Sequence, residues 1–230
     1  MPEQVAVISD VHSNLEALLE VLSRVKGMDV YCLGDIVGYG ANPNEVVEEI
    51  RNRRAVALMG NHDYAAVTGD VRMFNPRAAM AAKWTSKTLT SANLEFLGSL
   101  PKSRRLRLGG VEGYLTHGSP DDPLWEYVDP RTHSELLGHY LVKLNVGILG
   151  LGHTHVPFVD SEGRGVVFNP GSVGQPRDGD WRASYAIVTV EDGEVGVENM
   201  RMEYDWKEAS SKIRAVGLPE QLADRLSSGT

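Results

Sequence analysis

The stretch QVAVISDVHSNLEALLEVLSRVKGMDVYCLGD, residues 4–35, begins and ends with an apolar run that leads into an aspartate. Each run has the length and composition of a buried strand. Ser13 and Glu16 form the pattern of a capping box at the start of a helix between the runs, and Gly27 is a stop signal at its end. The stretch therefore predicts a strand–helix–strand unit. The leucines that would share one face of the helix are Leu15, Leu18, Leu19 and Leu22.

The same alternation of strand and helix continues to residue 63. We expect a second helix over residues 42–53, where Asn42 can act as the cap and Pro43 takes the first helical position. The run AVALMGNHD, residues 55–63, predicts a third strand that leads into a polar cluster. Strands and helices that alternate at this spacing are typical of a parallel α/β sheet.

The rest of the chain adds helices and strand pairs to this sheet. Residues 64–100 are predicted to be helical, with Ser91 as the cap of the last helix in the segment. The sequence pattern alone thus indicates an α/β fold with added hairpins. The further expected elements are a strand pair turning at Gly109–Gly110, a helix over 129–144, a strand over 146–155, hairpins turning at Glu162–Gly163 and Asp192–Gly193, and a tail over 206–230 with two short helices interrupted at Gly217–Pro219.

Composition restricts the function. The 230 residues include 31 acidic and 23 basic side chains, a formal net charge of −8, which argues against nucleic-acid binding. Cys32 is the single cysteine, so an intrachain disulfide is excluded. The sequence contains no leader pattern and no membrane-length apolar run, so we expect a cytoplasmic protein with no membrane contact. A homo-oligomer remains open.

Five of the strand-like runs end in residues that can bind metals. Taken singly, each cluster is explained better by a turn or by a hydrogen-bonded core histidine than by a metal site. Ligands of α/β sheets gather at the carboxyl ends of strands, and all five clusters fall there, so together they predict a metal site. In the last cluster, His153 and His155 would point the same way because alternate residues of a strand share a face. The clusters are Asp10 with His12; Asp35; Asn61 with His62 and Asp63; His117; and His153 with His155. Because these clusters interleave along the chain, we expect one domain over residues 1–230.

This set, in this order, resembles the calcineurin-like metallophosphoesterase superfamily, whose blocks are D-x-H, G-D, G-N-H-D, a lone H and G-H-x-H. A later stretch, FNPGSVGQPRDGD (168–180), resembles the small bacterial and archaeal phosphodiesterase branch. The resemblance implies a four-layer α/β/β/α sandwich of two facing mixed sheets flanked by helices. The five blocks are SDVHSN (9–14), LGDIVGYG (33–40), GNHD (60–63), THGSP (116–120) and GHTH (152–155).

The resemblance also implies two divalent metal ions. Manganese is the expected metal, and iron, zinc, nickel, cobalt and magnesium remain open, because mixed nitrogen and oxygen ligands suit several of them. Asp35 would be shared between the two ions. The resemblance assigns Asp10, His12, Asp35 and His155 to the first metal, and Asp35, Asn61, His117 and His153 to the second.

The function implied by the resemblance is hydrolysis of a small phosphoester, most of all a phosphodiester, by in-line attack of a metal-bridging hydroxide. His62 would be a general acid, or a stabiliser of phosphate charge, at the leaving oxygen. Asp63 would orient the His62 ring; a helix or turn cap is the alternative for this residue. Asn61, His62 and Arg177 are the candidate substrate-binding residues.

Two other functions stay open at this point. A phosphomonoesterase or a nucleotide pyrophosphatase would use the same metal centre. A catalytically inactive scaffold would keep the fold, but it should have lost ligands or His62, and none is missing. In each case the helical segment 64–100 could roof the site and shape substrate entry. A nucleotide-binding Rossmann module is disfavoured because LGDIVGYG lacks the G-x-G-x-x-G spacing.

Overall fold

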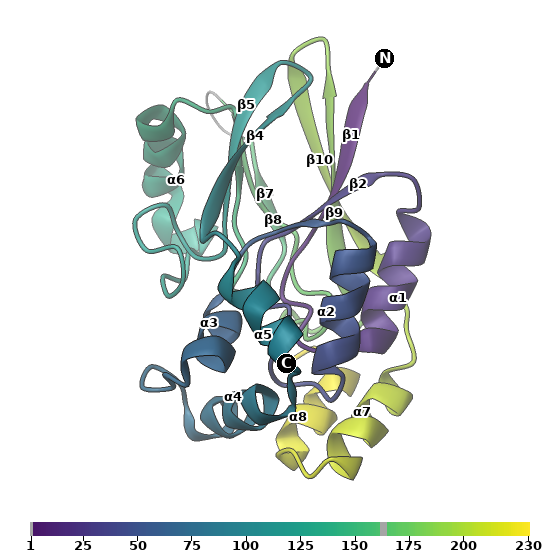
Figure 1. Cartoon of the computed structure of the whole chain (residues 1–230). Coiled ribbons are helices and arrows are strands. Elements are labelled where there is room, and N and C mark those ends of the chain that lie inside the picture. Colours follow the sequence, from purple (N-terminus) through teal and green to yellow (C-terminus); the bar gives the residue numbers. More distant parts are fainter. Residues whose placement is uncertain (1, 162–164) are drawn as a thin grey trace.

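The computed structural model describes residues 2–161 and 165–230, apart from the side chains of residues 133 and 134. It contains two five-stranded sheets that face each other (Figure 1). The first sheet consists, in spatial order, of β10 (Glu194–Met202), β9 (Ala183–Glu191), β1 (Glu3–Ile8), β2 (Asp29–Cys32) and β3 (Val56–Ala57). The second sheet consists of β4 (Ser103–Leu108), β5 (Val111–Thr116), β6 (Ile148–Gly150), β8 (Val166–Asn169) and β7 (Phe158–Asp160).

Both sheets are mixed. In the first, β1, β2 and β3 run parallel, and the β9–β10 hairpin is added antiparallel along β1. In the second, β5, β6 and β8 run parallel, with β4 and β7 antiparallel at the edges. Helices connect the parallel strands β1, β2 and β3, as crossovers between parallel neighbours require. The carboxyl ends of the parallel strands lie toward the lower end of Figure 1.

Helices cover the outer faces of both sheets and the end where the parallel strands finish (Figure 1). In that view α1 and α2 lie on one flank, α6 lies on the other, and α3, α4, α5 and α8 gather below the sheets. The helices are α1 (Leu15–Arg24), α2 (Pro43–Asn52), α3 (Asn61–Thr68), α4 (Pro76–Thr88), α5 (Ser91–Gly98), α6 (Pro130–Leu144), α7 (Trp206–Ala215) and α8 (Glu220–Asp224), followed by a 3-10 turn over Arg225–Ser227.

Three apolar clusters fill the three spaces between the four layers. Along β1, Ala6 and Ile8 pack toward the helices, whereas Val5 and Val7 pack between the sheets. This alternation follows from the two-residue period of a strand, and it gives β1 two buried faces. The third cluster joins α6 to the second sheet through residues such as Leu137 and Leu149. The four-layer sandwich expected from the resemblance is confirmed.

Two predicted helix caps are wrong by one residue. Asn14, not Ser13, caps α1, and its side-chain oxygen accepts a hydrogen bond from the Ala17 amide at 3.1 Å. Ser13 adopts a φ of 54° and its amide donates to the Ile36 carbonyl, so it belongs to the loop that crosses to the neighbouring strand. Similarly, Thr90 rather than Ser91 caps α5.

The strands that lead into the polar clusters are shorter than predicted. β3 ends at Ala57, and the GNHD block forms Gly60 as the N-cap and the first turn of α3. β6 ends at Gly150, so the last two histidines lie in a loop. The expectation that His153 and His155 share a strand face is therefore wrong; loop geometry, with φ values of 67° and 60°, orients them.

The later elements agree with the sequence pattern. The β9–β10 hairpin turns at Asp192 and Gly193, both with positive φ, as a two-residue hairpin turn requires. The tail is interrupted at Gly217, where φ is 74°. The predicted turn at Glu162–Gly163 lies outside the described residues, although β7 and β8 on either side of it pair antiparallel. Among the helices of the described part of the chain, none has the length and apolarity needed to cross a membrane.

Candidate metal centre

The structure brings the seven predicted metal ligands together where the parallel strands end. All seven are buried, with at most 4% of their surface exposed. The loops after β1, β2 and β6 hold five of them in left-handed backbone conformations, which cost energy for residues other than glycine and cluster at functional sites. These five residues, with φ between 50° and 67°, are Asp10, His12, Asp35, His153 and His155.

The strained loops are fixed by hydrogen bonds to one another. The amides of Asp10 and His12 donate to the carbonyls of Gly34 and Asp35 at 3.0 and 2.9 Å. These hydrogen bonds connect the β1 loop to the β2 loop and so fix the backbone of the ligands that the two loops carry. The loops form a preorganised site.

One group of ligand atoms gathers around the β1 loop and the last block. His12 Nε2 lies 3.0 Å from His155 Nε2. Asp10 Oδ1 lies 3.3 Å from His155 Nε2 and 3.7 Å from His12 Nε2. Asp35 Oδ2 completes the group at 3.6 Å from His12 Nε2. We call these four residues cluster A; they are the four predicted ligands of the first metal.

The imidazole tautomers show that cluster A fits a cation. His12 Nδ1 lies 3.2 Å from the Val37 carbonyl oxygen, and His155 Nδ1 lies 2.5 Å from the Gln175 carbonyl oxygen. A carbonyl only accepts hydrogen bonds, so in each neutral ring Nδ1 carries the proton. Both Nε2 atoms then turn lone pairs toward each other, and the buried Asp10 Oδ1 beside them has no hydrogen-bond partner among the described residues. Lone pairs that converge in this way are stabilised by a divalent metal.

A second group gathers on the other side of Asp35. His117 Nε2 lies 3.1 Å from Asn61 Oδ1, 3.2 Å from His153 Nδ1 and 3.4 Å from Asp35 Oδ2. His117 Nδ1 lies 3.0 Å from the Leu33 carbonyl oxygen, which orients the ring. We call Asp35, Asn61, His117 and His153 cluster B. It contains the four predicted ligands of the second metal.

Asp35 Oδ2 belongs to both clusters. The other carboxylate oxygen, Oδ1, accepts a hydrogen bond from the His62 amide at 2.8 Å, which fixes the plane of the carboxylate. Burial alone would raise the pKa of Asp35, but the positive charge of His117 outweighs this effect and holds the pKa well below its usual range. Asp35 is therefore an anion between the two clusters.

The histidines have two kinds of electrostatic environment. Burial lowers the pKa of His12 and His155 well below the usual value, and it lowers the pKa of His153 to about 3. These rings are neutral, which is the form that binds metals. At His117 burial also lowers the pKa, but Asp35 outweighs this effect and raises it to about 9. The carboxylate thus favours a positive charge in cluster B.

Gly60 allows the close approach of α3 to Asp35. A Cβ atom at Gly60 would overlap the carboxylate oxygen Oδ1 of Asp35 and its backbone amide. We expect Gly60→Ala to displace the shared carboxylate, to weaken metal binding and to destabilise the fold by about 1–3 kcal/mol. Metal titration and thermal unfolding measure both effects. Gly138→Ala is the matched control, because a Cβ there meets nothing within 4 Å; equal behaviour of the two variants would contradict the role of Gly60.

His62 lies beside the clusters in a largely aromatic environment. Its ring stacks on Phe74 with 4.5 Å between centroids and lies 4.3 Å from the ring of Tyr39. Its Nδ1 is buried and has no hydrogen-bond partner among the described residues. Burial lowers the pKa of His62 to about 4. His62 therefore lies next to the metal ligands as a ring whose Nδ1 is buried against Gly38.

Asp63 contacts backbone amides. Its carboxylate accepts hydrogen bonds from the amides of Gly60 at 2.9 Å, Val37 at 3.0 Å and Ile36 at 3.3 Å. The first closes a capping box at the start of α3, and the other two fix the loop that follows Asp35. Among the described residues, the hydrogen bonds of the Asp63 side chain go to these backbone amides, as in the cap that is the alternative interpretation of this residue.

Arg177 lies over the ring of Tyr39, with 5.9 Å from its guanidinium carbon to the ring centroid. Together with Asn61, His62 and several metal ligands it lines a small cavity of about 70 Å³. The three predicted substrate-binding residues therefore face one space. The residues at positions 73–75 and Ala78, from the segment before α4 and its first turn, also line this cavity.

Sequence reasoning missed two contributors to the site. Ser9 donates a hydrogen bond to Asp10 Oδ2 at 2.6 Å and so leaves Oδ1 directed at cluster A. Its position next to a ligand is the one signal that could have marked it. Phe74 supplies the surface on which His62 stacks, and its place in a polar turn before α4 gave no signal of this contact.

The two histidines of the last block contact different clusters, so we expect His153→Ala and His155→Ala each to remove one metal. His153→Ala should empty cluster B and His155→Ala should empty cluster A, because each ring nitrogen lies among one set of ligands. Elemental analysis counts the ions, and anomalous diffraction from crystals of each variant locates the ion that remains. Loss of the same ion in both variants would contradict the division into two clusters.

Comparison with known proteins agrees with this geometry. Residues 4–193 match the calcineurin-like phosphoesterase superfamily domain, and the chain belongs to this superfamily. Uncharacterized protein MJ0912 of Methanocaldococcus jannaschii is 42% identical over 243 residues, with 96% of each chain covered. The crystal structure of a metallophosphoesterase from Sphaerobacter thermophilus is 37% identical, with a TM-score of 0.81 and 99% of each chain covered. Phosphodiesterase YfcE of Escherichia coli is 25% identical over 194 residues, 78% of this chain and 84% of the relative.

These matches confirm the resemblance to the superfamily and to its small bacterial and archaeal branch. The family binds divalent metals, and the buried groups Asp10–His12–His155 and Asp35–His117–His153 are candidate ligand sets for them. Family and site together define a metal-dependent phosphoesterase of the hydrolase class.

Proposed function

We propose that this protein is a phosphodiesterase that uses two divalent metal ions. The observation that supports the proposal is that clusters A and B share one carboxylate oxygen, Asp35 Oδ2. When bound, two such ions supply Lewis acidity and a hydroxide nucleophile for in-line displacement at phosphorus. Manganese is the metal we propose for both clusters.

The charges of the site favour an anionic substrate. Asp10 and Asp35 are the acidic ligands of the two clusters, and two carboxylates do not neutralise two divalent ions. The remaining positive charge would attract a phosphoester into a protein whose formal net charge is −8. Arg177, on the wall of the same cavity, adds a fixed positive charge.

His62 is proposed to act on the leaving oxygen. Its place on the cavity wall suits a group that donates a proton to substrate. Because its pKa is about 4, the ring is neutral in the free protein at neutral pH. Proton donation therefore requires that the negative charge of the bound phosphoester raises this pKa.

A diester is favoured over a monoester because the relative YfcE is named a phosphodiesterase. A phosphomonoesterase or a nucleotide pyrophosphatase with the same centre is the second candidate. The inactive scaffold is disfavoured because all seven ligands and His62 are present and gathered in one place.

We propose that segment 64–100 selects substrates as part of the cavity wall. We also propose that the protein works in the cytoplasm on a small phosphoester.

Activity of metal-free protein reloaded with each divalent metal tests this proposal. The substrates are bis(4-nitrophenyl) phosphate, 4-nitrophenyl phosphate and a dinucleoside polyphosphate. We expect the diester to be hydrolysed with the highest kcat/KM, and manganese to give the highest activity. A preference for the monoester or the polyphosphate would select the second candidate, and no turnover with any metal would support the scaffold.

A further inference from the structure

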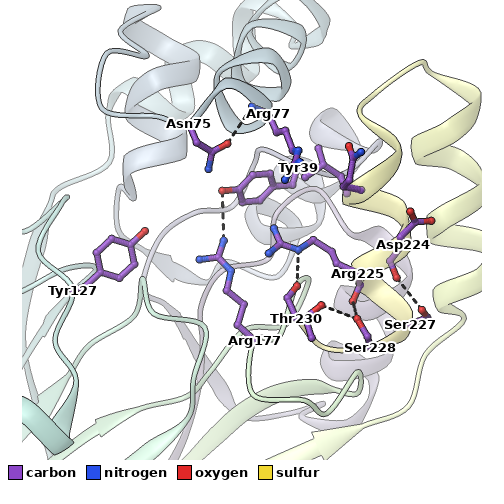
Figure 2. A pocket seen from close by; sticks show the side chains of 12 residues that line it. Tyr39, Asn75, Arg77, Tyr127, Arg177, Asp224, Arg225, Ser227, Ser228 and Thr230 are labelled. Carbon is purple, nitrogen blue, oxygen red and sulfur yellow. Dashed lines mark hydrogen bonds between the residues drawn. The ribbon is translucent and has the colours of Figure 1, made fainter.

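A larger pocket opens beside the metal cavity. It has a volume of about 560 Å³, within the range of small-molecule sites. Tyr39, Asn75, Tyr127 and Arg177 line both the pocket and the metal cavity, so the two spaces are neighbours with a common wall. The opposite wall comes from α8 and the residues after it, which the site described above does not use (Figure 2).

Three guanidinium groups face this pocket, from segments far apart in the sequence. Arg77 belongs to α4, Arg177 to the loop after β8, and Arg225 to the turn after α8 (Figure 2). Within the part of the chain that the structure describes, no side-chain carboxylate forms an ion pair with any of the three. Asp224, which also lines the pocket, forms its ion pair with Arg214 at 2.7 Å. The acidic side chains of the described residues thus leave these three positive charges unpaired.

Two of the arginines are held next to each other by one side chain. Gln175 Oε1 accepts hydrogen bonds from Arg177 Nη2 and Arg225 Nη1, both at 3.2 Å. Gln175 is itself 2% exposed, and its backbone N–H donates to Ser172 Oγ at 2.7 Å. A buried amide that holds two half-buried guanidinium groups together opposes their mutual repulsion, which is the arrangement expected of a site built for an anion.

Both arginines keep donors for a ligand. Arg177 Nη1 and Arg225 Nη2 have no hydrogen-bond partner among the described residues, and Arg177 Nη2 reaches the Tyr39 hydroxyl at a long 3.5 Å. Arg225 Nε donates to a main-chain oxygen of Thr230, the last residue of the chain, at 2.5 Å, and its Nη1 donates to Gln175. Burial and repulsion from Arg177 and Arg77 lower the pKa of Arg225, which shows that the three charges are close.

We propose that this pocket binds a second phosphate group of the substrate, while the first phosphate lies at clusters A and B. The substrate class is then a small phosphoester with two phosphate groups, such as a nucleotide that carries a phosphate apart from the ester. Only the placement of the first phosphate at clusters A and B rests on the proposed function. A confined pocket in a protein with a net charge of −8 favours this small ligand over a nucleic-acid strand.

Binding to the manganese-loaded protein tests the proposal without turnover. The probes are α,ω-alkanediol bisphosphates of increasing chain length and the matching alkyl monophosphates, measured by calorimetry. We expect one range of lengths to bind about tenfold or more tightly than the monophosphate, because guanidinium–phosphate hydrogen bonds are strong. The ratio of the monophosphate dissociation constant to the bisphosphate dissociation constant should fall toward one in Arg225→Gln. It should also fall toward one in Arg77→Gln, which replaces the exposed arginine of the pocket.

Arg107→Gln is the matched control, since Arg107 is an exposed arginine of β4 outside the pocket, and it should keep the wild-type ratio. Equal binding of bisphosphates and monophosphates at every length would overturn the proposal, as would an unchanged ratio in both pocket variants. A different outcome would show that the proposed function is wrong and that the second phosphate site is right. In that case the protein would keep the bisphosphate preference but hydrolyse no diester with any metal.

Discussion

Asp35→Asn should abolish diester hydrolysis and lower metal occupancy in both clusters. Asp35 Oδ2 lies 3.6 Å from His12 Nε2 in cluster A and 3.4 Å from His117 Nε2 in cluster B, so one charge serves both. The amide of an asparagine keeps the shape and can still accept the hydrogen bond from the His62 amide, but it removes the negative charge. If the transition state loses several kcal/mol of stabilisation by the metals, kcat/KM falls by about 10³-fold or more.

Elemental analysis and diester turnover of the same preparation check this prediction. Asp29→Asn is the matched control, because Asp29 is an exposed carboxylate at the other end of β2. The control should keep both metals and full activity, and circular dichroism should show both variants folded. Two tightly held metals and full activity in Asp35→Asn would contradict the shared ligand.

His62→Asn should separate proton donation from metal binding. Nitrophenolate leaves readily as an anion, whereas the alkoxide of a ribose needs a proton. General acid catalysis contributes about 10²–10⁴-fold in rate. We therefore expect the variant to keep both metals, to retain much of its rate on a nitrophenyl diester, and to lose about 10²–10⁴-fold on an alkyl or nucleoside diester.

The measurement is the dependence of kcat on the leaving group at constant metal occupancy. An equal loss on both substrates would show that His62 stabilises phosphate charge instead. Loss of a metal would make His62 a ligand. One of its ring nitrogens lies within 4.8 Å of candidate ligand atoms of His12 and Asp35, so metal content must be measured with the rates.

The positions of the ligands along the sheets could be predicted because they follow from strand periodicity. Asp10 and Asp35 each come after a buried apolar run and His117 comes after the second strand of a predicted pair, and the carboxyl ends of parallel strands meet at one edge of a sheet. The division of ligands between two metals came from the resemblance. Spacing alone gave no means of assigning His153 and His155 to different clusters.

The local geometry of the site could not be predicted. The left-handed conformations at His153 and His155 depend on loops far apart in the sequence, and the residue types carry no signal for them. The sequence left a role in orienting His62 and a cap as equal alternatives for Asp63, and only the packing of α3 against the loop after Asp35 distinguishes them. Arg225 was missed for the same reason: its approach to Arg177 is set by how the tail packs.

Anomalous diffraction from crystals of the manganese-loaded wild-type protein tests the central claim most directly. We expect two manganese peaks about 3.5–4 Å apart, one among the ligands of cluster A and one among those of cluster B, with Asp35 Oδ2 bound to both. A single peak at full occupancy under saturating manganese, or two peaks of which Asp35 touches only one, would contradict the dinuclear centre.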